Sequence, residues 1–327
     1  ADPDNNELKK KYIDASAELL SYCIKYDALL VLDAEMKPED KEKEHKIYQP
    51  KGVNSAIQLL QAAQNYSNSE NQEELKQGAK YAEIFINAME NSNLMKDFKH
   101  AELEGWKTYS KAFRAQSYLN IEGTPEETIV NAYKALFNTN FKGIAYQSLM
   151  NYYREKDKAK QNLYLQEGID ALKGDAEQKD LRANFVTILM QNQFQAGDKE
   201  GFMKTAEIMK TEFADDENAV NAYLMEGQFA FEAKDYETAK KAFLAGSEKY
   251  PDDEKCLLMA ARSAWMKAQT TGSKKEDMNE AITLFKKLEA ANPESPELWG
   301  ESLYVLYNNT QQPKLAANYK KYYKSNK

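Results

Sequence analysis

Apolar residues recur at steps of three and four along almost the whole chain, in short blocks separated by polar turns. This spacing places the apolar positions of each block on one face of a helix. We expect roughly fifteen helices of ordinary length. Because the connections are short, consecutive helices should pack antiparallel. The first block is the longest and predicts one buried helix face, formed by Leu8, Tyr12, Ala15, Leu19, Tyr22, Cys23, Tyr26 and Leu30.

The polar and charged residues between the apolar blocks predict where helices end and begin. The charged stretch 37–44, which contains Pro38, reads as an exposed loop. Thr124, Pro125 and Glu127 provide a capping residue, a proline in the first turn and an acidic residue three positions after the cap, as is typical of a helix start. The acidic pairs at 215–216 and 252–253 fall at helix junctions, where we expect them to cap the next helix rather than to act as an acid and a base.

The C-terminal blocks repeat one another. Gly227, Ala239, Phe243, Gly246 and Pro251 occur in an order that returns in the next segment. There the corresponding residues are Ala261, Ala281, Phe285, Leu288 and Pro293, and a third segment has Trp299, Leu315 and Tyr319.

This pattern resembles the tetratricopeptide repeat, a helix pair of about 34 residues with small and aromatic residues at set offsets. The small residues Gly227 and Ala239 would allow the two helices to cross closely. The match departs from the family at Glu226, where a leucine is usual, and at Phe229, one place before the usual tyrosine. The resemblance covers 219–325 clearly and is degenerate before that.

The resemblance implies an all-α fold, a right-handed α-solenoid of antiparallel helix pairs. We divide the sequence into 1–97, a helical segment that either caps the stack or belongs to it, 98–178, with degenerate repeats, and 179–327, with the tetratricopeptide-like repeats. Such a stack presents a concave groove lined by the first helix of each pair. Carrying over the family's concave positions gives the candidate partner-binding residues Asn184, Thr187, Gln191, Asn221, Leu224, Gln228, Lys255, Leu258, Arg262, Glu297 and Tyr304.

The composition of the chain disfavours several classes of function. The formal net charge of -8 disfavours nucleic acid, because a phosphate backbone requires a basic face. Cys23 and Cys256 lie far apart and inside apolar helical blocks, so we expect two buried thiols. The two histidines, His45 and His100, lack metal-ligand spacing, and no phosphate loop or nucleophile motif occurs. The sequence therefore predicts no cofactor, no metal, no enzyme activity and no membrane span, and it leaves the oligomeric state open.

Three hypotheses follow. The first is an interaction scaffold whose groove binds a protein or an extended peptide. The second is a receptor subunit for a small ligand or glycan at the cell envelope. The third is an enzyme whose site has no sequence signature. The polar start Ala1-Asp2-Pro3 resembles the end left by signal-peptide removal, although a cloning remnant would look the same. We expect an exported protein in the periplasm, the cell envelope or the medium.

Overall fold

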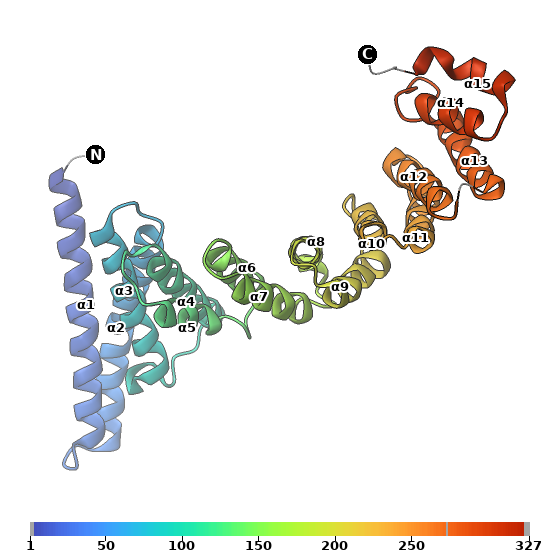
Figure 1. Cartoon of the computed structure of the whole chain (residues 1–327). Coiled ribbons are helices and arrows are strands. Elements are labelled where there is room, and N and C mark those ends of the chain that lie inside the picture. The colour runs from blue at the N-terminus through green and yellow to red at the C-terminus, as the bar shows by residue number, and fades with distance from the viewer. Residues whose placement is uncertain (1–2, 273, 324–327) are drawn as a thin grey trace. The chain divides into compact units, whose positions relative to one another are not determined.

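The computed structural model of the chain describes residues 3–272 and 274–323. Over these residues fifteen α-helices follow one another, and no β-strand occurs (Figure 1). The all-α prediction is confirmed. Ala1 and Asp2, on which the expectation of export depends, lie outside the described residues.

The chain divides into two compact units, residues 1–172 and residues 173–327, called unit 1 and unit 2 below. The predicted segments 1–97 and 98–178 together correspond nearly to unit 1, and the segment 179–327 corresponds nearly to unit 2.

Unit 1 contains seven α-helices in its described part, and each packs mainly against its neighbours in sequence. Helix α2 also contacts α4, and α1 contacts α3, so that packing extends beyond adjacent pairs. The helices are α1 (Pro3–Leu32), α2 (Pro38–Tyr66), α3 (Gln72–Asn91), α4 (Leu103–Asn120), α5 (Glu126–Lys134), α6 (Lys142–Tyr153) and α7 (Lys158–Ala171), with a 3-10 turn at Asn93–Met95.

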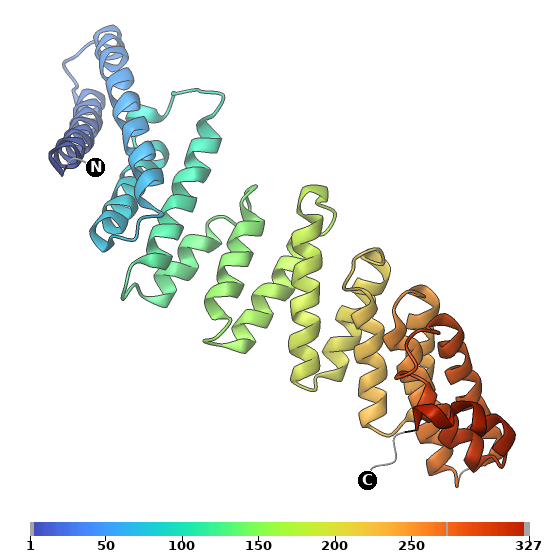
Figure 2. The same ribbon diagram turned by 90° about the horizontal axis from the view of Figure 1, so that it is seen from above.

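Unit 2 repeats this arrangement, and its helices follow one another in sequence order (Figure 2). Helix α10 also contacts α12, so the first helices of two successive pairs touch. The helices are α8 (Lys179–Gln195), α9 (Lys199–Glu212), α10 (Val220–Glu232), α11 (Tyr236–Lys249), α12 (Glu254–Thr270), α13 (Lys275–Ala291), α14 (Gly300–Asn309) and α15 (Pro313–Tyr319), with 3-10 turns at Ala176–Gln178 and Lys320–Tyr322.

Aspartates fix several helix starts. The side chains of Asp157, Asp198, Asp235 and Asp253 each accept a hydrogen bond from a backbone N–H in the first turn of the helix that follows. Asp253 accepts from the N–H groups of Lys255 and Cys256 at 2.9 and 3.2 Å, as the capping prediction for 252–253 requires.

Three local predictions are wrong. The acidic pair 215–216 does not cap α10, because the N-cap residue of that helix is Ala219, and Asp216 Oδ1 accepts from the backbone N–H of Asn218 at 2.8 Å instead. The stretch 37–44 is not a loop, because α2 begins at Pro38 and runs on to Tyr66. A proline is pre-organised for the first helical position, and Glu39 and Asp40 suit the positive end of the helix dipole. Thr124 does not cap α5, since its hydroxyl donates instead to the carbonyl oxygen of Ile121 at 2.9 Å.

Only part of the first predicted helix face is buried. Cys23 and Leu30 lie in the core, whereas Leu8 and Tyr12 are 66% and 60% exposed, and Leu19 and Tyr22 are also exposed. The predicted set spans more than one side of α1. Within its unit α1 contacts α2, α3 and the 3-10 turn Asn93–Met95, and these cover one side only.

The close helix crossing predicted at Gly227 is confirmed. A Cβ atom placed on Gly227 would overlap the ring of Phe243, which reaches from α11 against α10. Gly246, also on α11, is equally constrained, because a Cβ there would approach Cys256 Sγ at 2.7 Å and Tyr223 Cβ at 2.8 Å. These small residues let α10, α11 and α12 pack side by side.

Replacing Gly227 with alanine should lower the free energy of unfolding by about 1–3 kcal/mol, because the added methyl group must displace a buried ring. Thermal unfolding followed by circular dichroism measures the effect. Gly105→Ala is the matched control, since a Cβ there meets no atom closer than Tyr109 Cε2 at 3.8 Å. The control should be neutral or slightly stabilising. Equal losses in both variants would show that the crossing does not require glycine.

Candidate functional site

A pocket of about 430 Å³ lies within unit 2, among α8, α10, α11 and α12. Six of its lining residues were predicted from the repeat pattern: Asn221, Leu224, Gln228, Lys255, Leu258 and Arg262. The remaining lining residues are Phe194, Met225, Phe243 and Met259. The structure therefore brings together residues from four helices, α8, α10, α11 and α12.

Helical spacing explains why these side chains converge. The predicted residues of α10 are separated by three and four positions, and so are those of α12, which places each set on one face of its helix. Because α10 and α12 contact each other directly, the two faces form adjoining walls. The Asp253 cap fixes where α12 begins and so the position of Lys255 in its first turn.

The floor of the pocket is apolar. Leu224, Met225, Leu258 and Met259 are partly exposed, and Phe243 is buried beneath them. Methionine side chains are flexible and polarizable, so they adapt to ligands of different shape. The floor could therefore take an apolar side chain of a partner.

The rim of the pocket is polar and positively charged. The Gln228 amide donates to Glu232 Oε1 at 2.8 Å. Lys255 and Arg262 are exposed, and neither has an ion-pair partner among the described residues. They lie seven positions apart on α12, which corresponds to about 10.5 Å along the helix axis. The rim thus offers two unpaired cations beside an apolar floor.

The other five predicted residues lie outside this pocket lining. Asn184 and Gln191 are exposed on α8, and the Thr187 hydroxyl, also on α8, donates to the Ala183 carbonyl oxygen at 3.1 Å. Glu297 precedes α14, because that helix begins at Gly300. Tyr304, on α14, is partly buried.

Tyr304 contributes to packing. Its ring lies 4.7 Å from that of Tyr323, and it packs against the main hydrophobic cluster of unit 2. Tyr307 belongs to the same cluster, and Phe231 and Trp265 pack against it. Truncating Tyr304 would therefore change stability together with any binding.

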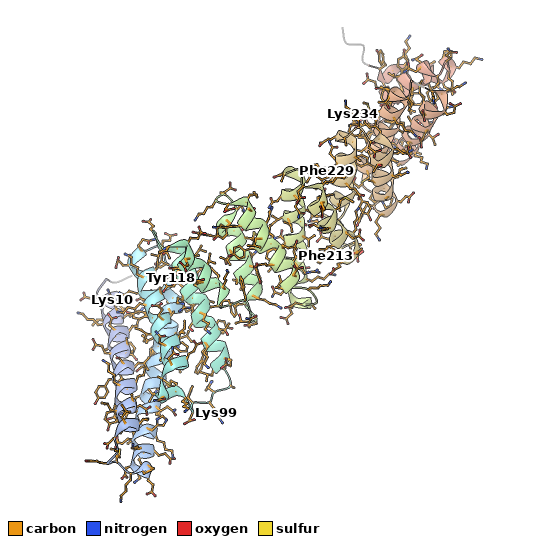
Figure 3. All side chains as sticks on the ribbon, turned by 60° about the horizontal axis from the view of Figure 1, so that its bottom comes forward. Lys10, Lys99, Tyr118, Phe213, Phe229 and Lys234 are labelled. Carbon is orange, nitrogen blue, oxygen red and sulfur yellow. The ribbon has the colours of Figure 1, made fainter. Side chains whose placement is uncertain are left out.

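Four pocket residues were not predicted from the sequence. Met225 and Met259 follow predicted residues directly, and the family's concave positions carried no signal for them. Phe194 belongs to an aromatic cluster with Phe202 and Phe229, with ring centroids 4.8 to 6.1 Å apart (Phe229 is labelled in Figure 3). The spacing of α8 alone does not reveal that cluster.

Reactive groups near the pocket are shielded. Cys256 is fully buried on α12, and burial raises the pKa of its thiol to about 12, so the thiolate form is scarce at neutral pH. In the described part of the chain no group of three or more histidine, cysteine or acidic side chains could hold a metal ion. Among the helices of residues 3–272 and 274–323, none combines the length and the apolarity that a membrane span requires.

A larger pocket of about 870 Å³ lies within unit 1, among α1, α2 and α3. Its walls are rich in amides, including Gln58, Gln61, Asn65 and Gln77. Gln77 Oε1 is buried and has no hydrogen-bond partner among the described residues. No sequence pattern predicts this pocket, because the repeat pattern does not extend to these helices.

Comparison with family models and with curated proteins gave no match to this sequence. The resemblance to tetratricopeptide repeats therefore continues to depend on the residues quoted for it.

An ion cluster holds α12 between α11 and α13. Lys267 of α12 contacts Glu237 of α11 at 2.8 Å, and the nearly buried Lys240 contacts both Glu237, at 3.0 Å, and Glu280 of α13, at 2.5 Å. Hydrogen bonds from Lys267 and then Lys240 lower the pKa of Glu237 to about 2. Since α12 carries one wall of the pocket, this cluster helps to position the site.

The Glu237 carboxylate should stabilise unit 2 in a pH-dependent way. Its pKa is lower in the folded chain than its ordinary value of 4.5, so its contribution is complete above about pH 4.5 and disappears as the pH falls towards 2. Glu237→Gln should therefore cost about 1 kcal/mol at pH 7, a figure kept low because the side chain is partly exposed. Thermal unfolding from pH 7 to pH 2 measures the difference from wild type.

The exposed Glu248 of α11, which has no ion pair among the described residues, provides the control variant Glu248→Gln. This control should show little loss at any pH. A cost for Glu237→Gln that stays constant from pH 7 to pH 2 would contradict the role given to the carboxylate.

Proposed function

We propose that unit 2 is a right-handed stack of antiparallel, tetratricopeptide-like helix pairs that binds an extended segment of another protein. The binding site is the pocket between α10 and α12, and the role is that of a non-catalytic scaffold or adaptor. The observation that carries this proposal is that six residues, expected from the family's concave positions, converge on one pocket.

The chemistry of the pocket indicates the kind of segment. The apolar floor suits one aliphatic or aromatic side chain, and burial of such a side chain supplies about 1.5–3 kcal/mol. The Asn221 and Gln228 amides can hydrogen-bond an extended backbone. Lys255 and Arg262 can pair with carboxylates on either side of the apolar residue. We therefore infer a partner segment with an apolar anchor flanked by acidic residues.

Arg262→Glu should weaken such a peptide at least about tenfold, because it replaces an attraction with a repulsion at the rim of the pocket. A peptide library with an apolar centre and acidic flanks, followed by calorimetric titration of the best binder, measures the change. Lys287→Glu is the matched control: Lys287 is exposed on α13, outside the pocket, and has no ion-pair partner among the described residues.

Leu258→Ala tests the floor independently and should also reduce affinity. Equal binding by wild type and both pocket variants would overturn the assignment of the groove, provided that circular dichroism shows all variants folded.

The amide-rich pocket of unit 1 favours a second function, a receptor for a small polar ligand or glycan. Amides with free hydrogen-bonding capacity are suited to hydroxyl-rich ligands, and Gln77 Oε1 accepts no hydrogen bond from the part of the chain that the structure describes. Tyr12 and Tyr66 add two aromatic rings to the lining. Under this hypothesis unit 1, and not the repeats of unit 2, carries the binding site.

A thermal-shift screen with sugars and short peptides separates the two functions. A sugar present at 100 times its Kd should stabilise the protein by about 2.7 kcal/mol and raise Tm by several degrees. The double variant Gln61→Ala/Asn65→Ala should lose that shift. Gln64→Ala is the control, since Gln64 is exposed on the same helix but does not line the pocket. No shift with any sugar would argue against the second function.

A further inference from the structure

Helix α1 carries a long apolar stripe that unit 1 leaves largely exposed, and its first residues, Leu8 and Tyr12, also line the pocket of unit 1. The stripe repeats at alternating steps of four and three positions, and Leu8, Leu19 and Leu29 are 66%, 43% and 65% exposed. Tyr12 and Tyr22 are similarly exposed, and Tyr26 is partly covered by Tyr48 of α2. The full stripe is Leu8, Tyr12, Ala15, Leu19, Tyr22, Tyr26 and Leu29.

A different side of α1 anchors it to its own unit. Ser16, Leu20, Cys23, Asp27 and Leu30 are buried, and Asp27 contacts His45 Nδ1 of α2 at 2.6 Å. At 3.6 residues per turn, the centre of the stripe lies about a quarter turn around the helix from this buried side. Most of the anchoring of α1 therefore comes from this buried side. Within the stripe, Tyr26 also contacts α2, through the ring of Tyr48 at 4.3 Å and through Glu44 Oε2 at 3.3 Å.

We propose that this stripe is a homodimer interface, in which α1 pairs with α1 of a second copy as an antiparallel coiled coil. Apolar residues that repeat every 3.5 positions form the seam of such coils. In heptad terms Leu8, Ala15, Tyr22 and Leu29 occupy d positions, and Tyr12, Leu19 and Tyr26 occupy a positions. From Leu8 to Leu29 the seam extends about 32 Å along the helix axis.

The charges beside the seam determine the orientation. The residues preceding the a positions are Lys11, Glu18 and Lys25, at g. A parallel pair would place these charges opposite the e positions of the partner, which are Ser16, Cys23 and Leu30 in this sequence. Those three residues are uncharged and buried within unit 1. An antiparallel pair places g opposite g, so that the exposed charges meet.

The charges also determine the register. When Leu19 lies opposite Tyr22 of the partner subunit, Glu18 faces Lys25 of the partner subunit, and the same pair recurs by symmetry. Neither side chain has an ion pair within the described part of its own chain. The same register also packs Ala15 against Tyr26 of the partner subunit, a small side chain against a large one.

Neighbouring registers are unfavourable. A shift of one helix by seven residues in one direction places Lys11 opposite Lys25 of the partner subunit. It also places Glu18 opposite Glu18 of the partner subunit. A shift by seven residues in the other direction places Lys25 opposite Lys25 of the partner subunit. Like charges in contact disfavour both alternatives.

Sedimentation velocity of the full chain across a concentration series tests the dimer. Wild type should show a concentration-dependent dimer. Leu19→Glu and Tyr22→Glu should each raise the dimer Kd by at least about a hundredfold, because a buried carboxylate would face the seam. Ser21→Glu is the matched control, as Ser21 is exposed on α1 away from the stripe. Helical content and unfolding by circular dichroism show that each variant remains folded.

Charge exchange tests the register. Glu18→Lys and Lys25→Glu should each weaken the dimer about tenfold or more, and the double exchange should restore it, because opposite charges again face each other. Oxidation of a mixture of Leu19→Cys and Tyr22→Cys should give the mixed disulfide in preference to either symmetric one, because this register places the two positions opposite each other. Both natural cysteines are buried and should not compete.

A wild-type chain that sediments as a monomer at all concentrations overturns the dimer proposal, whatever else covers the stripe. A dimer that survives Leu19→Glu and Tyr22→Glu places the interface elsewhere on the chain and also overturns it. A dimer in which the symmetric Tyr22→Cys disulfide forms preferentially is parallel and contradicts the antiparallel orientation.

Discussion

The contact on which unit 2 depends is the close approach of α10 and α11 at Gly227 and Phe243. Each helix is too short to bury its apolar side alone, and most helical stability in proteins comes from packing of one face against a neighbour. Where glycine removes the side chain, the ring of Phe243 can occupy the space between the helices. Gly246 plays the same role on the other side of α11, between Tyr223 and Cys256.

This packing also shapes the candidate site. Phe243 fills the crossing and at the same time supports the pocket floor, so stability and binding share a residue. The opposite wall depends on α12, which Lys267 ties to Glu237. The cations that take part in this cluster are neutralised within the chain. Lys255 and Arg262 are not, and they are therefore the charges available to a partner.

Features that follow from the local spacing of residues could be predicted from the sequence. Features that depend on contacts with residues far away in the sequence could not. Gly227 and the helix faces of α10 and α12 were predictable, because side chains three and four positions apart share a face. The resemblance to tetratricopeptide repeats grouped Tyr304 with the groove residues, whereas its contact with Tyr323 gives it a part in packing. For α1, periodicity marked apolar residues but could not tell which of them α2 and α3 would cover.

The two uncovered apolar surfaces, the pocket in unit 2 and the stripe on α1, call for different partners. The pocket is small and its unpaired charges are all positive, so a second copy of the same surface would be repelled. Its complement is acidic and belongs to another molecule. The stripe is long and regular, and its flanking charges alternate in sign. Such a surface is complementary to itself when reversed, and the simplest partner for it is another α1.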